Sequence, residues 1–149
     1  MSEWSIGVDI VEVARFKGLD YSSHKQFYER VFTSKEIEYC LSFKSPSPHF
    51  AVNFAGKEAV YKAINRFFDV KLHDIEILRD ENGVPRVNLH LNHNSETENE
   101  SQETSLPFEI KVSLSHSSSY AVAFAVARNP LKLVGNHKSK RERVLPDEF

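Results

Sequence analysis

The length, composition and charge of the chain restrict the classes of protein to which it can belong. Its 149 residues are enough for one domain with a hydrophobic core, and a content of 40% hydrophobic and 27% charged residues is typical of globular proteins. The formal net charge of −2 gives no overall basic field for nucleic acid, and the single cysteine, Cys40, excludes an internal disulfide framework. Acidic residues interrupt the N-terminus and no segment approaches the roughly 20 apolar residues of a membrane span, so we expect a cytoplasmic protein with no nucleic-acid or membrane partner.

The first part of the chain predicts one strand and then short helices. Residues 5–13 alternate between apolar and polar side chains, and their β-branched content favours a strand. On this strand Asp9 points away from the face that carries the isoleucine and valine side chains. Helical turns are expected over residues 14–32, with Ser22 or Ser23 as the N-cap of the second turn.

Two further helices follow, and the second is the longest element of the chain. Thr33 and Glu36 form a capping-box pattern, which predicts that a helix begins there. The prolines of "KSPSPH" end that helix, because proline cannot continue it. Residues 49–67 then carry apolar side chains on most sides, which is typical of a central helix covered by other elements.

The second half of the chain predicts antiparallel strands. The stretch "HDIEILRDENGVPRVNLHL" alternates on both sides of Asn82-Gly83, a dipeptide that favours a tight hairpin turn. Residues 108–116 and 120–127 are expected to form two more strands joined by a serine-rich turn. The outline is a strand, helices, a long helix and a group of four antiparallel strands, which indicates an α+β fold.

Two polar segments stand apart from the expected domain, which spans residues 1–128. Residues 92–106 have almost no apolar side chains and repeated glutamate, so we expect a solvated acidic loop insertion. Residues 129–149 contain proline and many basic residues, and we expect a basic C-terminal tail. An interaction module that recruits partners through these two segments is therefore one functional hypothesis.

The long helix carries charged residues among its apolar positions. Glu58 and Lys62 are one helical turn apart, which is also the spacing of an ordinary surface ion pair. Lys57 lies roughly 100° around the helix from Glu58. The small residues around Gly56 either leave room for a ligand or allow another backbone to pack closely, and the sequence leaves both explanations open.

Two residues outside this helix are further candidates for chemistry. Asp9 lies in an apolar strand, where it is either a structural acid bonded to backbone amides or a metal ligand. Two carboxylates, with phosphate oxygens and water, commonly hold magnesium, and Asp9 and Glu58 are the best candidates for such a pair. His116 follows a predicted strand among small hydroxyl residues, where it is able to donate to a phosphate or to move a proton.

Four motifs, in this order and spacing, make a more specific pattern than any of these residues alone. They are "GVDIVEVARF", "FAGKEAVYKA", "ENGVPRV" and "VSLSHSSSYAVAFAV". Together they closely resemble the holo-acyl-carrier-protein synthase family, the small type of 4'-phosphopantetheinyl transferase. The resemblance extends from residue 6 to residue 127, with the acidic loop as an apparent insertion.

The resemblance implies a fold and a reaction. The fold is that of the 4'-phosphopantetheinyl transferases, in which a long central helix packs against an antiparallel sheet. The family transfers the phosphopantetheine arm of coenzyme A to a serine of an apo acyl carrier protein, releases adenosine 3',5'-bisphosphate and requires Mg2+. It typically forms trimers with active sites at subunit boundaries, so we expect a homotrimer. Such an assembly would place Asp9 and Glu58 on different chains' sides of one cleft, or nearly so, which the sequence alone leaves open.

The same resemblance assigns roles to particular residues. The expected catalytic residues are Glu58, Asp9, Lys62 and His116, and the first two are also the expected magnesium ligands. The residues expected to bind coenzyme A are Lys44, Lys57, Lys62, Gly83, Pro85, Ser115 and His116. Glu58 is the first choice, and Asp9 the second, for the base that accepts the proton of the carrier serine.

One position departs from the pattern of the family. Its members commonly carry arginine just before the "FA(A/G)KEA" motif, whereas this chain has Asn53. A fixed positive charge near the phosphates is then missing unless Lys44, Lys57 or His49 replaces it. A non-catalytic protein that binds coenzyme A or nucleotides on the same fold is the alternative function that this departure allows.

The second substrate predicts a basic surface. Carrier proteins of this kind present an acidic helix, which a basic surface would attract and orient. Arg15 and Lys17 match the docking segment of the family, and Lys25 and Arg30 are positioned to extend it. The sequence leaves open whether the carrier protein serves fatty-acid synthesis, polyketide assembly or both.

Overall fold

The computed structural model describes residues 3–67, 69–90 and 109–129. Its elements are β1 (Glu3–Glu12), α1 (Val13–Lys17), α2 (Lys25–Val31), α3 (Ser34–Leu41), α4 (Pro46–Ile64), the 3-10 helix η1 (Leu72–Asp74), β2 (Ile75–Arg79), β3 (Pro85–Leu89), β4 (Glu109–His116) and β5 (Tyr120–Asn129). The acidic loop expected at 92–106 lies outside the described residues. So does the expected basic tail, apart from Asn129, which ends β5.

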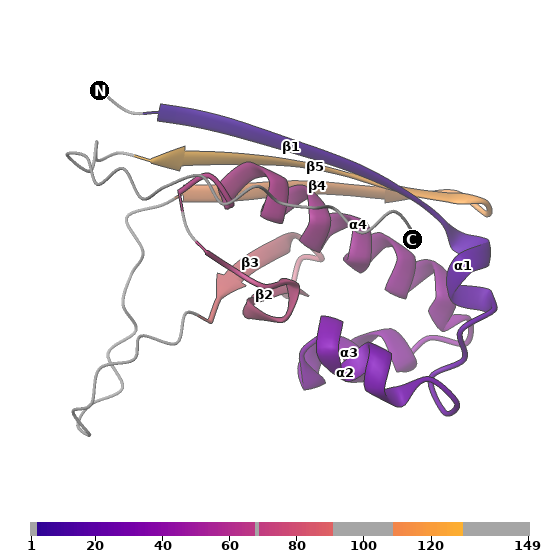
Figure 1. The fold of residues 1–149 in the computed structure, drawn as a ribbon. Coiled ribbons are helices and arrows are strands. Elements are labelled where there is room, and N and C mark those ends of the chain that lie inside the picture. The colour runs from indigo at the N-terminus through magenta and orange to yellow at the C-terminus, as the bar shows by residue number, and fades with distance from the viewer. Residues whose placement is uncertain (1–2, 68, 91–108, 130–149) are drawn as a thin grey trace, which may run out of the picture.

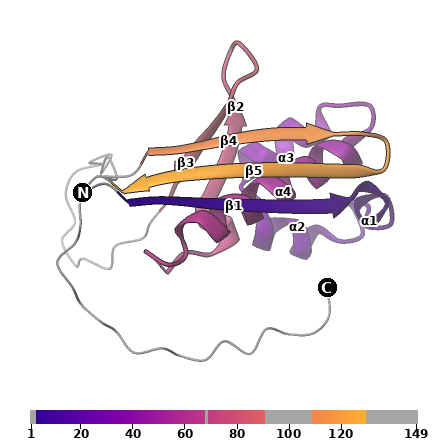
Figure 2. The ribbon, with the colours of Figure 1, turned by 90° about the horizontal axis from the view of Figure 1, so that it is seen from above.

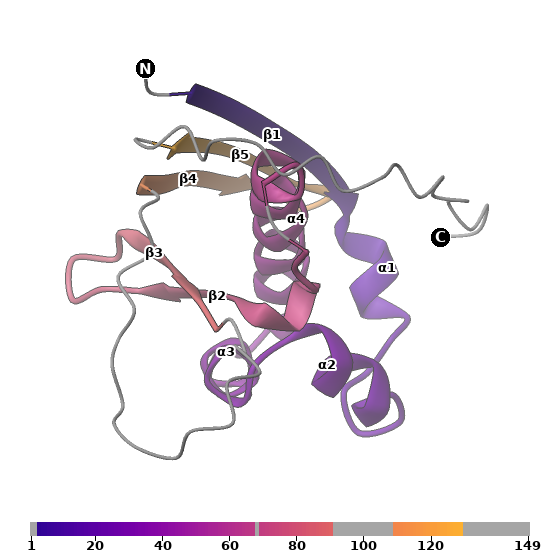
Figure 3. The ribbon, with the colours of Figure 1, turned by 60° about the vertical axis from the view of Figure 1, so that its left-hand side comes forward.

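The helix α4 lies at the centre of the molecule, between two layers of β-structure. A three-stranded antiparallel sheet in the order β1-β5-β4 covers one side of α4, and the β2-β3 hairpin and α3 lie on the other side (Figure 1, Figure 3). The short helix α1 follows β1 directly and packs beside α4 (Figure 3). The expected α+β fold, with a long central helix against an antiparallel sheet, is confirmed.

The prediction that the last four strands form one group is wrong. β2 and β3 form a separate two-stranded sheet, whereas β1 joins β5 and β4 (Figure 2). β1 pairs with β5 along the full length of both strands, from Glu3 opposite Asn129 to Glu12 opposite Tyr120. Hydrophobic periodicity identifies a segment as a strand but carries no information about its partner, so the pattern did not place the N-terminal strand in this sheet.

Small side chains form the face of the three-stranded sheet that meets α4. The inward positions of β5 are alanines, which are at most 1% exposed: Ala121, Ala123, Ala125 and Ala127. Gly7 of β1 lies opposite Ala125 and is also buried. Without bulky side chains on this face, the backbone of the sheet approaches α4 closely at Gly7.

The closest approach occurs at Gly7, which predicts a large effect of a single methyl group. A Cβ atom there would lie 1.9 Å from the carbonyl oxygen of Ala59 and 3.0 Å from the amide nitrogen of Ala63, both backbone atoms of α4. We therefore expect Gly7→Ala to lower the free energy of unfolding by about 3 kcal/mol, as overpacking of a rigid core does. Denaturant unfolding measures this change.

Gly18 provides the matched control, because a Cβ atom there would meet its nearest neighbour, the carbonyl oxygen of Arg15, at an ordinary 3.7 Å. Its backbone φ of −79° also suits any residue. Gly18→Ala should therefore leave the stability unchanged or raise it slightly. Equal stability of the two variants would contradict the packing of β1 on α4.

The opposite face of the same sheet is apolar and exposed. Ile6, Val8 and Ile10 of β1 are between 58% and 66% exposed, and Val122 and Phe124 of β5 are 40% and 44% exposed. The alternation predicted that these side chains of β1 share a face. It did not predict that this apolar face points away from the helix. Gly7 explains the orientation, because α4 packs against the other face of β1, where Gly7 has no side chain. A contiguous apolar face of this kind indicates an interaction surface.

The N-termini of α2 and α3 show which of the predicted N-caps form. The hydroxyl of Thr33 accepts a hydrogen bond from the amide of Glu36 at 3.3 Å, and the Glu36 carboxylate accepts one from the amide of Thr33 at 2.9 Å, so the capping box of α3 is confirmed. The prediction of Ser22 or Ser23 as a cap is wrong, since α2 begins without a side-chain cap. The Ser22 hydroxyl instead donates to the carboxylate of Asp20 at 2.6 Å.

The central helix begins earlier than the sequence pattern indicated. It starts at Pro46, with proline in the first turn, and ends at Ile64. Proline is well suited to this position because its fixed φ is helical. It also lacks a backbone N–H, which would have no partner within the helix in the first turn. In the ranges that the structure describes, no helix has both the length and the apolar character needed to cross a bilayer.

Candidate active site

The fold brings Asp9 and Glu58 of the same chain to one cavity. Asp9 lies two residues after Gly7 on the inward face of β1, and Glu58 precedes Ala59, the residue of α4 that Gly7 meets. Both carboxylates line a cavity of about 400 Å³. The close contact between β1 and α4 therefore sets the position of the two carboxylates, and a single chain supplies both.

Lys62 joins the two elements at this site. Its Nζ atom donates to Oδ1 of Asp9 at 2.8 Å and to the carbonyl oxygen of Val8 at 2.9 Å. The ion partner of Lys62 is thus Asp9 on the neighbouring strand rather than Glu58 one turn earlier on α4. The ordinary surface ion pair that the spacing of Glu58 and Lys62 allowed does not form.

Burial and the neighbouring charge of Asp9 shift the pKa of Glu58 in the same direction. Burial raises the pKa of Glu58, and the negative charge of Asp9 raises it further, whereas the positive charges of Lys62 and Arg15 oppose the shift. A half-buried carboxylate beside a second carboxylate gains from any added positive charge. The pair is therefore suited to bind a divalent cation, and Glu58 is suited to accept a proton.

The donor set at this cavity fits magnesium. Mg2+ is usually held by one or two carboxylates together with phosphate oxygens and water. Across the described ranges there is no cluster of three or more His, Cys, Asp or Glu side chains that would hold a metal without other ligands. Asp9 and Glu58 would hold magnesium only when a ligand such as a diphosphate supplies the remaining oxygens.

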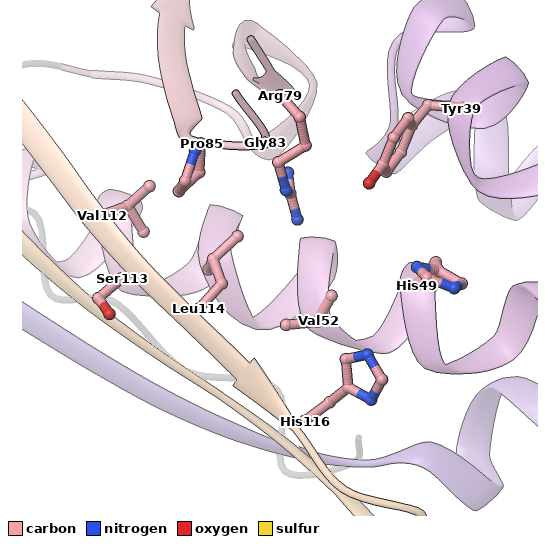
Figure 4. Close-up of a pocket in the computed structure, with 10 residues that line it drawn as sticks. All are labelled: Tyr39, His49, Val52, Arg79, Gly83, Pro85, Val112, Ser113, Leu114 and His116. Atoms are coloured by element: carbon pink, nitrogen blue, oxygen red, sulfur yellow. The ribbon is translucent and has the colours of Figure 1, made fainter. Parts of the chain in front are cut away.

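A second cavity, of about 340 Å³, contains the other predicted ligand-binding groups. His116 at the end of β4 lies on its wall with Gly83 and Pro85 of the hairpin turn (Figure 4). Gly83 has a φ of +77°, a conformation that favours glycine, and it closes the turn between β2 and β3. The sequence had placed His116 and this turn at the same ligand, and the fold brings them together.

The first turn of α4 contributes a further histidine to this cavity. His49 lines it, and its ring stacks on Phe43 with the centroids 3.5 Å apart. Lys44 follows Phe43 in the connection between α3 and α4, where it is exposed. His49 thus lines the cavity. Lys44 does not line it and is exposed next to Phe43 in the chain.

Neither Ser115 nor Lys57 is among the residues that line the two cavities. Ser115 lies opposite Val122 on the exposed outer face of the sheet. Lys57 is completely buried, and its Nζ atom donates to Oε2 of Glu36 at 2.6 Å and also to the carbonyl oxygen of Ile75. The prediction that Lys57 binds coenzyme A is wrong, because the side chain points into the core and is fully occupied by an internal ion pair.

The space beside Gly56 is occupied by protein side chains. A Cβ atom at Gly56 would lie 2.7 Å from Cδ1 of Ile77 and 3.0 Å from Cδ2 of Leu114. The space beside this glycine is therefore filled by core side chains of β2 and β4 rather than by a ligand. On the other side of α4, the backbone of β1 takes the space that the small Ala59 leaves.

Asn53, the position that departs from the family pattern, is fully buried. Its side chain bonds to the carbonyl oxygen of Ile77 and to the guanidinium of Arg79, which lines the second cavity. No motif of the sequence pointed to Arg79. The signal available for it was weak: a basic residue three positions before the Asn82-Gly83 turn, on the same hairpin as Pro85.

The basic residues expected to receive the carrier protein lie on α1 and α2, and one of them reaches the cavity of Asp9 and Glu58, here called the carboxylate cavity. Arg15 lines that cavity, and its guanidinium carbon is 5.2 Å from the centroid of the Phe54 ring. Lys17 ends α1, and Lys25 and Arg30 lie at the start and in the last turn of α2, all three exposed. The four residues therefore come from two consecutive helices at one end of the molecule.

The fold and the two cavities define a class of site. One cavity is lined by two carboxylates and the other by two histidines and an arginine. The first is suited to bind a divalent cation together with a phosphate-bearing ligand, and the second to bind an anion such as a phosphate. Residues 5–125 match the family model of the 4'-phosphopantetheinyl transferase superfamily. The chain belongs to this superfamily.

Its relatives narrow the class further. A holo-[acyl-carrier-protein] synthase of Chlorobaculum parvum is 46% identical over 92 residues, which cover 60% of this chain and 79% of the relative. The enzyme of the same name from Chlamydia felis is 38% identical over 107 residues, with 61% and 88% covered. The Bacillus anthracis synthase in complex with CoA (3',5'-ADP) has a similar structure, with a TM-score of 0.63, 29% identity and 84% and 96% of the two chains covered. The Helicobacter pylori synthase in complex with coenzyme A gives a TM-score of 0.62 at 28% identity, with 82% and 98% covered.

Proposed function

We propose that this chain transfers the 4'-phosphopantetheine moiety of coenzyme A to a serine of an apo acyl carrier protein. The observation that carries the proposal is the single cavity shared by Asp9 and Glu58, with Lys62 bonded to Asp9 beside it. A reaction at a diphosphate needs positive charge and an accurately placed base, and these three side chains supply both functions.

The reaction balances with the residues of this site. The serine oxygen of the carrier forms a bond to the β-phosphorus, the bond from that phosphorus to the bridging oxygen breaks, and adenosine 3',5'-bisphosphate leaves with the bridging oxygen. Glu58 accepts the serine proton, and both its burial and the charge of Asp9 raise its pKa, which favours proton uptake. Lys62 stabilises the negative charge that spreads over the phosphoryl oxygens.

Magnesium, when bound by Asp9 and Glu58, would polarise the diphosphate as a Lewis acid. His116 belongs to the second cavity and would contact a phosphate of coenzyme A, with Gly83 and Pro85 near the adenine. The nucleophile belongs to the carrier protein, so this chain needs no nucleophilic serine of its own.

Mass spectrometry of an apo acyl carrier protein tests the proposal. After incubation with this chain, coenzyme A and magnesium, the carrier should gain the mass of one phosphopantetheine group. No gain should occur when coenzyme A is omitted. Binding of coenzyme A without any gain, on carriers of fatty-acid synthesis and of polyketide assembly, would favour a non-catalytic nucleotide-binding protein instead.

We also propose that the chain forms a homotrimer, and the exposed apolar face of the sheet supports association between copies. It gathers the outward side chains Trp4, Ile6, Val8, Ile10, Tyr120, Val122 and Phe124, each at least 40% exposed in the single chain. A contiguous apolar surface of this size favours burial against other copies. His49 and Glu58 are nine positions apart on α4, which turns their side chains about 180° from one another. A long substrate would then reach both kinds of cavity at a boundary between copies.

Native mass spectrometry of the full chain measures the state of assembly. A homotrimer is expected at micromolar concentration. A monomer at that concentration would contradict the proposed assembly without contradicting the transfer reaction.

A docking surface for the carrier is proposed on α1 and α2. We define it by Arg15, which lines the carboxylate cavity, and by Lys17, Lys25 and Arg30 on the same two helices. Charge reversal at Lys17 and Lys25 together should raise KM for the carrier about tenfold at low salt, because an acidic helix would no longer be attracted. Steady-state kinetics measure this change.

The matched control for the docking surface is Lys35→Glu, a charge reversal at an exposed position of α3. This variant should leave KM for the carrier unchanged. The effect of the double reversal at Lys17 and Lys25 should also shrink at high salt. A salt-independent effect, or an equal effect of Lys35→Glu, would argue against this surface.

We also propose that the reaction takes place in the cytoplasm. Cys40 is buried, and burial raises the pKa of its thiol to about 12, so the only cysteine of the chain is an inert core residue. A chain without disulfides suits a reducing compartment.

A further inference from the structure

The second cavity has an uneven distribution of charge. It lies between the hairpin, the end of β4 and the first turns of α4 (Figure 4). Arg79, His49 and His116 reach it from β2, α4 and β4 respectively, and none of the ten described residues that line it is acidic. Three groups that carry or accept positive charge converge on one space, which therefore suits an anion.

Asn53 holds Arg79 in the wall of this cavity. Nδ2 of Asn53 donates to the carbonyl oxygen of Ile77 at 3.3 Å, and Oδ1 accepts a hydrogen bond from Nη2 of Arg79 at 3.0 Å. The Asn53 side chain is completely buried, so both ends of its amide are fixed by the core. The guanidinium carbon of Arg79 also lies 5.4 Å from the centroid of the Tyr39 ring. These contacts fix the orientation of the guanidinium group.

One nitrogen of this oriented group is left without an acceptor. Nη1 of Arg79 is buried and has no hydrogen-bond partner among the residues that the structure describes. A buried donor without a partner is costly, and the cost is larger for a charged group. Figure 4 shows the side chain extending from the hairpin into the cavity. An acceptor bound in the cavity would satisfy this nitrogen.

The two histidines place further donors in the same cavity. Their ring centroids are 5.7 Å apart, and the stacking of His49 on Phe43 fixes the plane of one ring. Burial lowers the pKa of His49, and the nearby His116 and Arg79 lower it further. A bound anion would reverse this repulsion, because it would stabilise the protonated form of the imidazole.

We propose that Arg79 binds a phosphate group of the coenzyme A substrate, and that Asn53 is the positioning residue that orients the guanidinium for this contact. A planar guanidinium donates two parallel hydrogen bonds to a phosphate, and a rigid orientation reduces the entropy lost on binding. The inference rests on the proposed function for the identity of the ligand. The 3'-phosphate and the diphosphate of coenzyme A offer the same chemistry, and the experiment separates them.

Isothermal titration with adenosine 3',5'-bisphosphate tests the contact without relying on activity. Arg79→Gln in the full chain should bind this nucleotide about 10- to 100-fold more weakly than the wild type, which is the range expected for a lost charged hydrogen bond. Arg86→Gln is the matched control. Arg86 is an exposed residue of β3 that pairs with Leu78, the residue before Arg79 on β2. An affinity of Arg79→Gln within twofold of the wild type, for this nucleotide and for coenzyme A alike, would overturn the inference.

The positioning role of Asn53 has a separate readout. Asn53→Ala keeps every charge in the cavity but removes the acceptor for Nη2 of Arg79. We expect KM for coenzyme A to rise about tenfold while KM for the carrier protein stays unchanged. KM does not depend on the fraction of folded protein, so a merely destabilised variant would not show this split. An unchanged KM for coenzyme A would overturn the role of Asn53.

Titration with 3'-dephospho-coenzyme A distinguishes the two phosphate sources. If Arg79→Gln and the wild type bind this compound equally, Arg79 contacts the 3'-phosphate; if the difference persists, Arg79 contacts the diphosphate, and either result supports the contact. A wild-type chain that binds no nucleotide and transfers nothing contradicts the proposed function. A wild-type chain that binds and transfers, while Arg79→Gln does so equally well, contradicts only this inference.

Discussion

Replacement of Glu58 by glutamine should lower kcat of the transfer reaction by about 10²- to 10⁴-fold, the usual contribution of a general base. The glutamine keeps the size of the side chain but can neither accept the serine proton nor neutralise a divalent cation. The pKa of Glu58 is raised by burial and by Asp9, so removal of its charge also removes a repulsion and should leave the fold intact. Single-turnover kinetics with apo carrier protein measure the chemical step.

The control for this variant is Glu38→Gln, which makes the same change at an exposed position of α3. It should leave kcat unchanged. Thermal unfolding of the Glu58→Gln variant should agree with the wild type within a few degrees. A Glu58→Gln variant with more than a tenth of wild-type kcat would remove Glu58 from the role of base.

Replacement of Lys57 by methionine should have its main effect on stability. Lys57 and Glu36 form an ion pair at 2.6 Å, and both side chains are completely buried. Glu36 also accepts hydrogen bonds from the backbone amides of Thr33 and Ile77, so it joins α3, α4 and β2. Methionine would leave the Glu36 carboxylate buried without its cation, which typically costs about 3–5 kcal/mol. Denaturant unfolding should show this loss.

Lys62→Met on the same helix should show the opposite pattern. The Lys62 side chain is 48% exposed, so its pair with Asp9 should contribute less than about 1 kcal/mol to stability. Its loss should instead reduce kcat, because Lys62 lies beside the carboxylates. A Lys57→Met variant with wild-type stability and a raised KM for coenzyme A would restore the assignment of Lys57 to the substrate.

Much of the fold followed from local patterns in the sequence. The capping box at Thr33, the Asn82-Gly83 turn and the apolar circumference of α4 each depend on residues within a few positions of one another. Pairing of strands does not, and the sequence pattern missed that β1 enters the sheet of β4 and β5. The decisive residue is Gly7, whose lack of a side chain is informative only when Ala59 is known to lie against it.

The candidate site shows the same limit. The motifs singled out Asp9, Glu58 and Lys62, and the fold brings these three together. Lys57 has the same chemistry as Lys62 and lies in the same motif, yet it points into the core because Glu36, 21 positions earlier, is its partner. The sequence does not distinguish a lysine that binds a ligand from a lysine that pairs with a buried acid. The packing of the helix does.

Arg79 illustrates the reverse case, a residue that sequence reasoning passed over. Its importance comes from contacts with Asn53, 26 positions earlier, and from the histidines of two other elements. No periodicity or motif within the hairpin distinguishes it from Arg86, which pairs at the surface with Asp80. Only the fold shows that one of these two arginines lines a cavity and the other does not.

The central claim is that one chain holds a divalent cation between Asp9 and Glu58 when coenzyme A is present. Mn2+ accepts the same oxygen ligands as Mg2+ and is visible by electron paramagnetic resonance, so its titration into the protein with coenzyme A measures the site directly. We predict that the wild type binds about one ion per chain in the presence of coenzyme A, and that a chain carrying both Asp9→Asn and Glu58→Gln loses this binding. Equal Mn2+ binding by the two proteins would contradict the claim.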